Sequence, residues 1–373
     1  MKVTIHKLFD YLLETTAAEP PECFIGFSLA RSPRLKDFLA ELDPALSLDW
    51  NGKSFLGLPA LRQRVLDQAG LDLPPDSVLI TAGAAEANYL LFRQLLSAGD
   101  ELITEAPGWP QAGVMAKAIG ARLVEVPRDE AQGWALDPDW VARAITPRTR
   151  MIFLTNPNNP TGRLIPEADL RALAALADRH GIWLVVDEVY AGLEWAGPRP
   201  PSSAGLTPFG IITGSVSKAL GLQGLRTGWM ICQSPEVIRD AMILRENSSE
   251  IMNVLGEHIA EIALRPERLA AALGRARAEG AEVLDRLDRF VNDEPRLNWH
   301  RPEAGLIGLA RVTGNDGESL ARALLAPPYR TFLLPGSAYG LAHHIRIGAG
   351  GGPEARLEEG LGRLSALLAS DRT

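Results

Sequence analysis

The chain has 373 residues, of which 46% are hydrophobic and 23% charged, and its formal net charge is −8. This composition is typical of a globular protein of about two domains and excludes the fibrous and disordered classes. Every long apolar stretch is interrupted before the roughly 20 residues of a membrane span, and no Lys/Arg-rich block offers a nucleic-acid surface.

The N-terminus and the cysteines indicate where the protein works. Lys7, Asp10 and Glu14 interrupt the apolar residues of the N-terminal segment, which therefore lacks the apolar core of a signal peptide. Cys23 and Cys232 lie far apart and in no C-x-x-C pattern, which favours neither a zinc site nor a disulfide framework. We expect a cytoplasmic protein with no metal site and with neither a membrane nor a nucleic acid as partner.

Helical patterns alternate with short β-rich segments between about residues 58 and 232. In chain order we expect helix 61–69, strand 77–81, helix 84–96, strand 101–104, helix 109–119, strand 122–126, a helix ending at 141–145, strand 151–155, helix 167–179, and strands 182–187, 211–213 and 228–232. Residues 151–155 and 182–187 are continuous apolar runs, as in parallel strands that are covered on both faces. The alternation predicts an α/β fold with a mostly parallel sheet and helices on both faces.

The pattern changes after residue 234. We expect a long helix at 267–290, strands at 306–312, 331–334 and 345–347, and helices near 318–325 and 353–369. This order predicts a smaller α+β domain. We therefore predict a large domain over residues 45–262 and a small domain over residues 1–44 and 263–373, although the pattern alone allows the N-terminal segment to pack on either.

The carboxyl ends of the parallel strands are where such a sheet binds ligands. After strand 77–81, Gly83, Ala84 and Ala85 open a helix, and small residues there let backbone amides approach an anion. The alternative is an ordinary strand-to-helix turn. Trp109 opens the helix after the next strand, either as a flat binding surface or as a core aromatic. Asn159 lies in the rigid turn Asn156–Gly162, whose alternative is a plain loop.

Two charged residues follow the next strands. Asp187 ends a fully apolar strand, where a carboxylate is costly to bury unless it meets a cation; the alternative is a helix N-cap. Lys218 follows strand 211–213 among serines and glycines, in a chain with only six lysines, and Arg226 lies eight residues further on. Burial and a cationic neighbour would lower the pKa of such an amine and make it nucleophilic. A solvated surface lysine is the alternative, but it leaves the series of Asn, Asp and Arg unexplained.

These residue types match the needs of pyridoxal 5′-phosphate (PLP). This cofactor requires a lysine for its aldehyde, a carboxylate facing its ring nitrogen and an anion site for its phosphate. It also requires a donor to its phenolic oxygen and a flat surface against its ring. The residues after the strands together predict a PLP site.

The chain resembles the fold type I PLP-dependent enzymes, and among them the class I/II aminotransferases. The resemblance covers most of the chain and rests on four motifs in order, Asn-Asn-Pro-Thr-Gly (158–162), Asp-Glu-Val-Tyr (187–190), Ser-Val-Ser-Lys (215–218) and Gly-Leu-Arg-Thr-Gly-Trp (224–229). It implies that Lys218 holds the cofactor covalently and that Asp187 pairs with the pyridine nitrogen. It also implies that Tyr190 and Asn159 reach the phenolic oxygen.

Further roles follow from the same resemblance. The implied phosphate cradle consists of Ser215, Ser217 and Arg226 with the amides of Gly83, Ala84 and Ala85. Trp109 matches the aromatic that stacks on the cofactor ring. Arg346, in His-Ile-Arg-Ile, would bind the substrate carboxylate as a bidentate fork, with Asn159 beside it.

The chain departs from the family's pattern at two places. Gly52 stands where many relatives have a phosphate-binding tyrosine from the neighbouring subunit, and Trp50, Lys53 or Phe55 are alternatives for that space. Arg31 lies in a segment that replaces the family's glycine-containing loop near the substrate carboxylate; it is either a substrate-recognition residue or a surface charge.

We therefore expect an aminotransferase that moves an amino group between an amino acid and a 2-oxo acid by ping-pong chemistry, as a homodimer. A PLP-dependent lyase, decarboxylase or cyclising enzyme on the same scaffold is the alternative, because the cofactor supplies the difficult chemistry. A non-catalytic PLP-binding regulatory module is a remote alternative. A dehydrogenase is not favoured, since no G-x-G-x-x-G follows an early strand.

Overall fold

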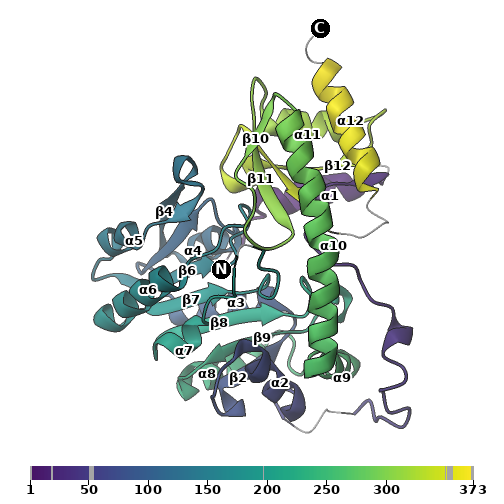
Figure 1. The fold of residues 1–373 in the computed structure, drawn as a ribbon. Coiled ribbons are helices and arrows are strands. Elements are labelled where there is room, and N and C mark those ends of the chain that lie inside the picture. Colours follow the sequence, from purple (N-terminus) through teal and green to yellow (C-terminus); the bar gives the residue numbers. More distant parts are fainter. Residues whose placement is uncertain are drawn as a thin grey trace.

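The computed structural model describes residues 2–17, 20–49, 54–195, 197–348, 350 and 356–370. Its largest element is an eight-stranded sheet (Figure 1). The strands, in their order across this sheet, are β2 (Val78–Thr81), β9 (Gly228–Cys232), β8 (Gly210–Ser215), β7 (Trp183–Asp187), β6 (Thr149–Thr155), β3 (Glu101–Ala106), β4 (Arg122–Asp129) and β5 (Ala135–Leu136). The five strands from β8 to β4 are parallel.

Helices cover both faces of this sheet, as predicted. They are α2 (Pro59–Ala69), α3 (Ala84–Leu95), α4 (Gln111–Ile119), α5 (Pro138–Ala144), α6 (Glu167–His180), α7 (Ser203–Leu206), α8 (Pro235–Arg245) and α9 (Val254–Ala263). Alternate residues of β6 point to opposite cores: Phe153 packs with α3, α4 and α8, whereas Ile152 and Leu154 pack with α5 and α6. Both faces of the central strands are therefore buried, which explains their continuous apolar sequence.

The sheet is mixed at its edges. β9 is antiparallel to both of its neighbours, β2 and β8, and β5 is antiparallel to β4. A parallel connection needs a crossover of a dozen or more residues, usually a helix. Between β8 and β9 the chain forms only a short 3₁₀ turn, Gln223–Leu225, so it returns beside β8 in the opposite direction.

The C-terminal part forms a smaller α+β unit. Its antiparallel sheet has the order β10 (Leu297–Trp299), β11 (Ile307–Val312), β14 (His344–Gly348) and β13 (Leu334–Pro335), and its helices are α10 (Pro266–Asp293), α11 (Gly317–Leu325) and α12 (Leu357–Ser370). Figure 1 shows α10 running from the level of α9 up to α12. The expected helix at 353–369 is α12, and residues 353–355 lie outside the described residues.

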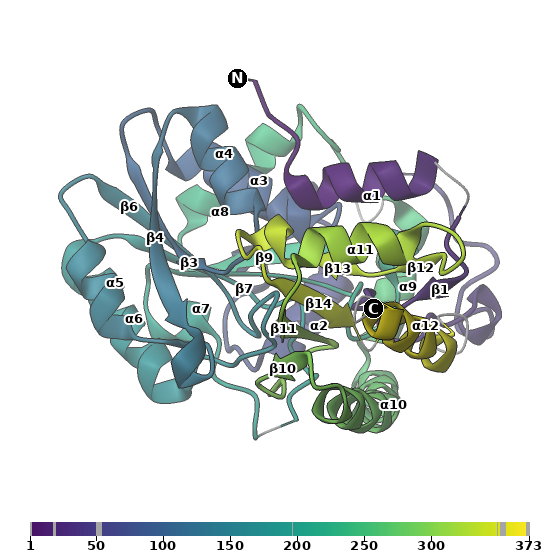
Figure 2. The same cartoon turned by 90° about the horizontal axis from the view of Figure 1, so that it is seen from above.

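One expected strand is divided. Residues 331–334 form β12 (Thr331–Phe332) and β13, because the first pair bonds to β1 (Cys23–Phe24) and the second joins β14. Helix α1 (Lys7–Ala17) packs through Leu8 and Tyr11 on the same unit (Figure 2). The N-terminal segment thus contacts the smaller unit; the exact domain bounds stay a prediction.

Two further observations concern membrane-spanning helices and the cysteines. None of the described helices is both long enough and apolar enough to cross a membrane. Cys23 and Cys232 are both buried and free.

Candidate active site

A cavity of about 360 Å³ lies where β6, β7 and β8 end, facing β13, β14 and α1. All predicted site residues except Gly83 line it, namely Ala84, Ala85, Trp109, Asn159, Asp187, Tyr190, Ser215, Ser217, Lys218, Arg226 and Arg346. Gly83 directly precedes Ala84 in the chain. Residues as far apart in the sequence as Ala84 and Arg346 therefore meet around one cavity, as expected for the carboxyl edge of a parallel sheet.

Asp187 ends β7 and is almost completely buried, with 4% of its surface exposed. Its carboxylate accepts hydrogen bonds from Asn88 Nδ2 at 2.8 Å and from the Val189 amide at 3.1 Å. Thr213 Oγ1 donates to Asn88 Oδ1 at 2.8 Å and so orients the amide. Burial raises the pKa of Asp187 to about 6. Because no cation pairs with this carboxylate among the described residues, a positively charged ligand atom would be its natural partner.

Lys218 lies in the loop after β8 and reaches the same cavity. Its Nζ donates to Ser28 Oγ at 3.3 Å and stands 5.6 Å from the centre of the Tyr190 ring. The Tyr190 hydroxyl also donates to Ser28 Oγ, at 3.0 Å. Burial, together with the positive charge of Arg346, lowers the pKa of Lys218 to about 8. The amine is therefore more readily deprotonated than an ordinary lysine, as a nucleophile or base requires.

Arg346, on β14, is a buried guanidinium with only 5% of its surface exposed. Its Nη1 donates to Asn159 Oδ1 at 3.1 Å and to the Tyr339 hydroxyl at 2.8 Å, and its Nη2 donates to the Gly26 carbonyl at 2.8 Å. Its Nε has no hydrogen-bond partner, and no carboxylate pairs with it in the described part of the chain. A buried guanidinium whose Nε is unsatisfied is suited to bind an anion, and a carboxylate matches its fork geometry.

The start of α3 provides a second anion site. Gly83 precedes the helix with φ +88°, and a Cβ at this position would lie 2.5 Å from Arg226 Nη2. Arg226 is held there by a bond from Nη2 to the Ala82 carbonyl at 3.1 Å. The first amides of a helix have no partner within it, and the helix dipole favours an anion there. Together with Ser215 and Ser217, this arrangement fits a phosphate group.

The described residues therefore fit PLP at three separate points. A buried carboxylate faces one side of the cavity, an amine of lowered pKa reaches into it, and a cradle for an anion forms another side. Trp109 lines the same cavity and brings an aromatic face to it. Within the described residues, no group of three or more His, Cys, Asp or Glu side chains is placed to hold a metal ion.

Sequence reasoning missed several residues of the cavity. Asn88 lies inside helix α3, where asparagine is unfavourable. This unfavourable position could have marked it in the sequence as a residue with a specific role. Ser28 contacts both Lys218 and Tyr190, yet its segment drew attention only through Arg31. Leu8 of α1, which lines the cavity, gave no local signal, and neither did Tyr339, which bonds to the lining residues Arg346 and Asn159. Only the tertiary fold brings both residues to this edge.

At the two departures from the family's pattern, the described residues Phe55 and Arg31 lie outside the active-site cavity. Trp50, Gly52 and Lys53 lie outside the described residues. Phe55 is 47% exposed and does not line the cavity. Arg31 is exposed and lines a different cavity, so within this chain it does not contact the site.

Comparisons with known proteins agree with this geometry. A family model described as aminotransferase class I and II matches residues 51–364. A probable aspartate/prephenate aminotransferase from Thermus aquaticus is 31% identical over 322 residues, which are 84% of this chain and 82% of that protein. Arginine–pyruvate transaminase AruH from Pseudomonas aeruginosa is 31% identical over 336 residues, 83% of this chain and 80% of its own. The crystal structure of a PLP-dependent aminotransferase from Streptococcus suis matches with a TM-score of 0.90 and 25% identity over 99% of both chains.

Proposed function

The chain belongs to the class I and II aminotransferases, and we propose that it acts on amino acids that carry an apolar side chain. As a member of this family it is a PLP-dependent enzyme that transfers an amino group between an amino acid and a 2-oxo acid. A transaminase is therefore favoured over the PLP-dependent lyase, decarboxylase or cyclising enzyme that the same scaffold could support. The residue roles and the assembly described below are part of the proposal.

The apolar wall beside Arg346 carries the substrate proposal. Leu334 is the direct β-sheet partner of Arg346 and lines the cavity. Leu8 and Leu12 of α1, together with Phe27, line it on the same side and belong with Leu334 to one hydrophobic cluster. A substrate whose α-carboxylate binds Arg346 would thus place its side chain against apolar groups, which favours an apolar side chain by about 0.8 kcal/mol per buried CH₂.

The charges of the cavity support the same choice. In the described part of the chain its only lysine and arginine residues are Lys218, Arg226 and Arg346. Lys218 and Arg226 are assigned to the cofactor and Arg346 to the α-carboxylate, so none of the described lysines and arginines of the lining is left for a second carboxylate. Asp187, which is assigned to the cofactor ring, is the only acidic residue among the described residues of the lining, so a cationic side chain finds no further partner among them.

The proposed reaction depends on three side chains. When bound, PLP draws electrons from the substrate α-carbon, so that the α-proton leaves more easily. We assign Asp187 to the ring nitrogen, where its carboxylate stabilises the protonated form; in a buried site this attraction is much stronger than in water. Lys218 Nζ would take the α-proton and then pass it on to the carbon of the cofactor, as base and then acid, for which its lowered pKa is suited. Arg346 orients the substrate for this transfer.

The remaining residues hold the cofactor in position. We assign Tyr190 and Asn159 to its phenolic oxygen and Trp109 to the face of its ring. Ser215, Ser217 and Arg226 would hold its phosphate together with the amides at the start of α3. Because Arg346 bonds to Asn159 at 3.1 Å, the substrate clamp and the proposed cofactor contacts share one hydrogen-bond network.

We also propose that the protein works as a homodimer in the cytoplasm. Large apolar side chains in the segment before α2 and on α9 are exposed: Leu48, Phe55 and Leu255. A second copy that covers them would remove this surface from water. The two free cysteines are compatible with a reducing compartment.

A panel of amino donors tests the substrate proposal, with pyruvate and 2-oxoglutarate as acceptors. We expect kcat/KM for leucine, methionine or phenylalanine to exceed that for aspartate by about tenfold or more, the equivalent of ~1.4 kcal/mol. Leu12→Arg should raise the rate with aspartate relative to leucine, since it adds a cation to the apolar wall. The matched control is Leu13→Arg, because Leu13 follows on α1, is 49% exposed and does not line the cavity. A preference of the wild type for aspartate would contradict the apolar pocket and leave the transaminase activity standing.

A further inference from the structure

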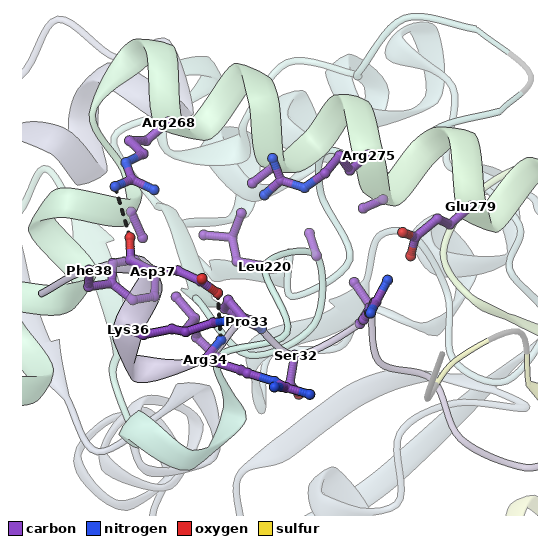
Figure 3. Close-up of a pocket in the computed structure, with 17 residues that line it drawn as sticks. Ser32, Pro33, Arg34, Lys36, Asp37, Phe38, Leu220, Arg268, Arg275 and Glu279 are labelled. Atoms are coloured by element: carbon purple, nitrogen blue, oxygen red, sulfur yellow. Dashed lines mark hydrogen bonds between the residues drawn. The ribbon is translucent and has the colours of Figure 1, made fainter. Parts of the chain in front are cut away.

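A second and larger cavity, of about 730 Å³, lies behind the loop that carries Lys218. We call it the arm groove. The segment Ala30–Phe38, the N-terminal half of α10 and the residues Ala219, Leu220 and Leu222 form its walls. Figure 3 shows α10 on one side, with Arg268, Arg275 and Glu279, and the segment with Arg34 and Lys36 opposite. None of the predicted active-site residues lines it.

The arm groove is positive in a protein whose net charge is −8. Its lining contains five basic residues and two acidic ones, namely Arg31, Arg34, Lys36, Arg268 and Arg275 against Asp37 and Glu279. A concave surface lined by one sign of charge concentrates ions of the opposite sign. The groove therefore attracts anions although the chain as a whole repels them.

Most of these cations have no counter-ion. Arg268 is engaged, since it donates to the Glu41 carboxylate and to the Asp37 carbonyl. In contrast, no carboxylate pairs with the side chains of Arg31, Arg34, Lys36 or Arg275 within the described ranges.

Elsewhere on α10 the arginines are used differently. Arg277 pairs with Glu194 at 3.3 Å, and Arg286 pairs with Glu358 at 3.0 Å. Of the four groove cations without a carboxylate partner in the described ranges, Arg275 lies on α10 and the other three lie on the segment Ala30–Phe38 that faces it.

The floor of the groove is apolar. Phe38 is buried with 6% exposure, and Leu220 and Leu222 with 8% each, while Ala272 and Ala276 of α10 close the side. A purely inorganic anion would use the cations alone and leave the small exposed part of this floor in contact with water. An anion that also has an apolar body would cover the floor, and each Å² of apolar surface so buried is worth about 25 cal/mol.

We propose that the arm groove is a binding site for an organic polyanion, with clustered phosphate or carboxylate charge at Arg31, Arg34, Lys36 and Arg275 and an apolar or aromatic body on the Phe38–Leu220–Leu222 floor. Its volume lies within the range of small-ligand sites, about 300–1,000 Å³. Guanidinium groups suit phosphate and carboxylate because they bind two oxygens at once. The site is separate from the active-site cavity, and its occupation does not depend on the transaminase reaction.

Calorimetric titration of the PLP-loaded enzyme at low salt tests this site with three probes: ATP, inorganic tripolyphosphate and adenosine. We expect ATP to bind with a Kd below ~1 mM. Tripolyphosphate should bind several-fold more weakly, because it lacks the apolar body, and adenosine should give no measurable binding, because it lacks the charge. The double variant Arg31→Gln, Arg275→Gln should weaken ATP binding by about tenfold or more, since charged hydrogen bonds are lost. Arg289→Gln, at another exposed arginine of α10 that does not line the groove, should leave it unchanged.

Three results would overturn the proposal. The first is the absence of binding heat with ATP up to about 10 mM, a level at which even weak sites fill. The second is an equal affinity of the double variant and the wild type, which would place the ATP elsewhere on the protein. The third is binding of tripolyphosphate as tight as that of ATP, which would contradict the part assigned to the apolar floor. All substituted side chains are exposed, so the fold is not at risk in this comparison.

Discussion

The two halves of the active-site cavity differ in what they present to a ligand. The half at the end of the eight-stranded sheet is polar and tightly hydrogen-bonded, as the chain of contacts from Thr213 through Asn88 to Asp187 shows. The half formed by α1, β13 and β14 is apolar around a single buried cation, Arg346. In the proposed function, the first half would therefore set the chemistry and the second half would select the substrate.

The largest effect is expected from breaking the polar half. Asp187→Ala removes the negative charge assigned to the cofactor ring, and we expect kcat to fall by about 10⁴, equivalent to ~5.5 kcal/mol of barrier. Cofactor binding should persist, because the phosphate cradle and Lys218 are untouched. Steady-state kinetics with absorbance of the bound cofactor measure both quantities. A kcat within a few-fold of the wild type would refute the assignment.

Removing the cation of the other half should lower activity less than the loss of Asp187 does. Arg346→Gln removes the fork assigned to the substrate carboxylate, and we expect kcat/KM to fall by about 10³, since two charged hydrogen bonds are lost. The absorbance of the bound cofactor should stay as in the wild type. Arg311→Gln is the control, because Arg311 lies on the neighbouring strand β11 and pairs with Glu130 outside the cavity. An equal loss in both variants would show that Arg346 acts only through the fold.

The smallest effect concerns the stability of the cofactor-free protein. Burial raises the pKa of Asp187 from 3.8 to about 6, so the folded chain binds more protons than the unfolded chain between these values. The free energy of unfolding should therefore fall as pH rises from about 4 to 6, by at most ~3 kcal/mol. Urea unfolding across this range measures the loss. Asp187→Asn should remove it, and identical pH slopes in variant and wild type would contradict the raised pKa.

The polar half could be predicted from the sequence because its residues follow their strands directly. Asp187 is the last residue of β7, Ser215 the last of β8, and Lys218 comes three residues later. Strand ends of a parallel sheet share one edge, so local patterns sufficed to bring these residues together. The helices and strands of this region were equally readable, because apolar runs and helical periodicity are local signals.

The apolar half could not be predicted in the same way. Leu8, Phe27 and Leu334 meet only because β1 pairs with β12 and α1 packs on the smaller unit. No spacing in the sequence encodes that pairing. The reversed direction of β9 and the break of the 331–334 segment into two strands escaped for the same reason: both depend on which distant strand each segment meets.

The central claim is that Lys218 holds the cofactor opposite Asp187. Reduction of the PLP-loaded enzyme with sodium borohydride, followed by peptide mass spectrometry, tests it directly, because reduction fixes the cofactor on the lysine that carries it. We expect one label, on the peptide that contains Lys218, and none on the peptides of the other five lysines. A label on another lysine, or no label on a protein that binds the cofactor, would contradict it.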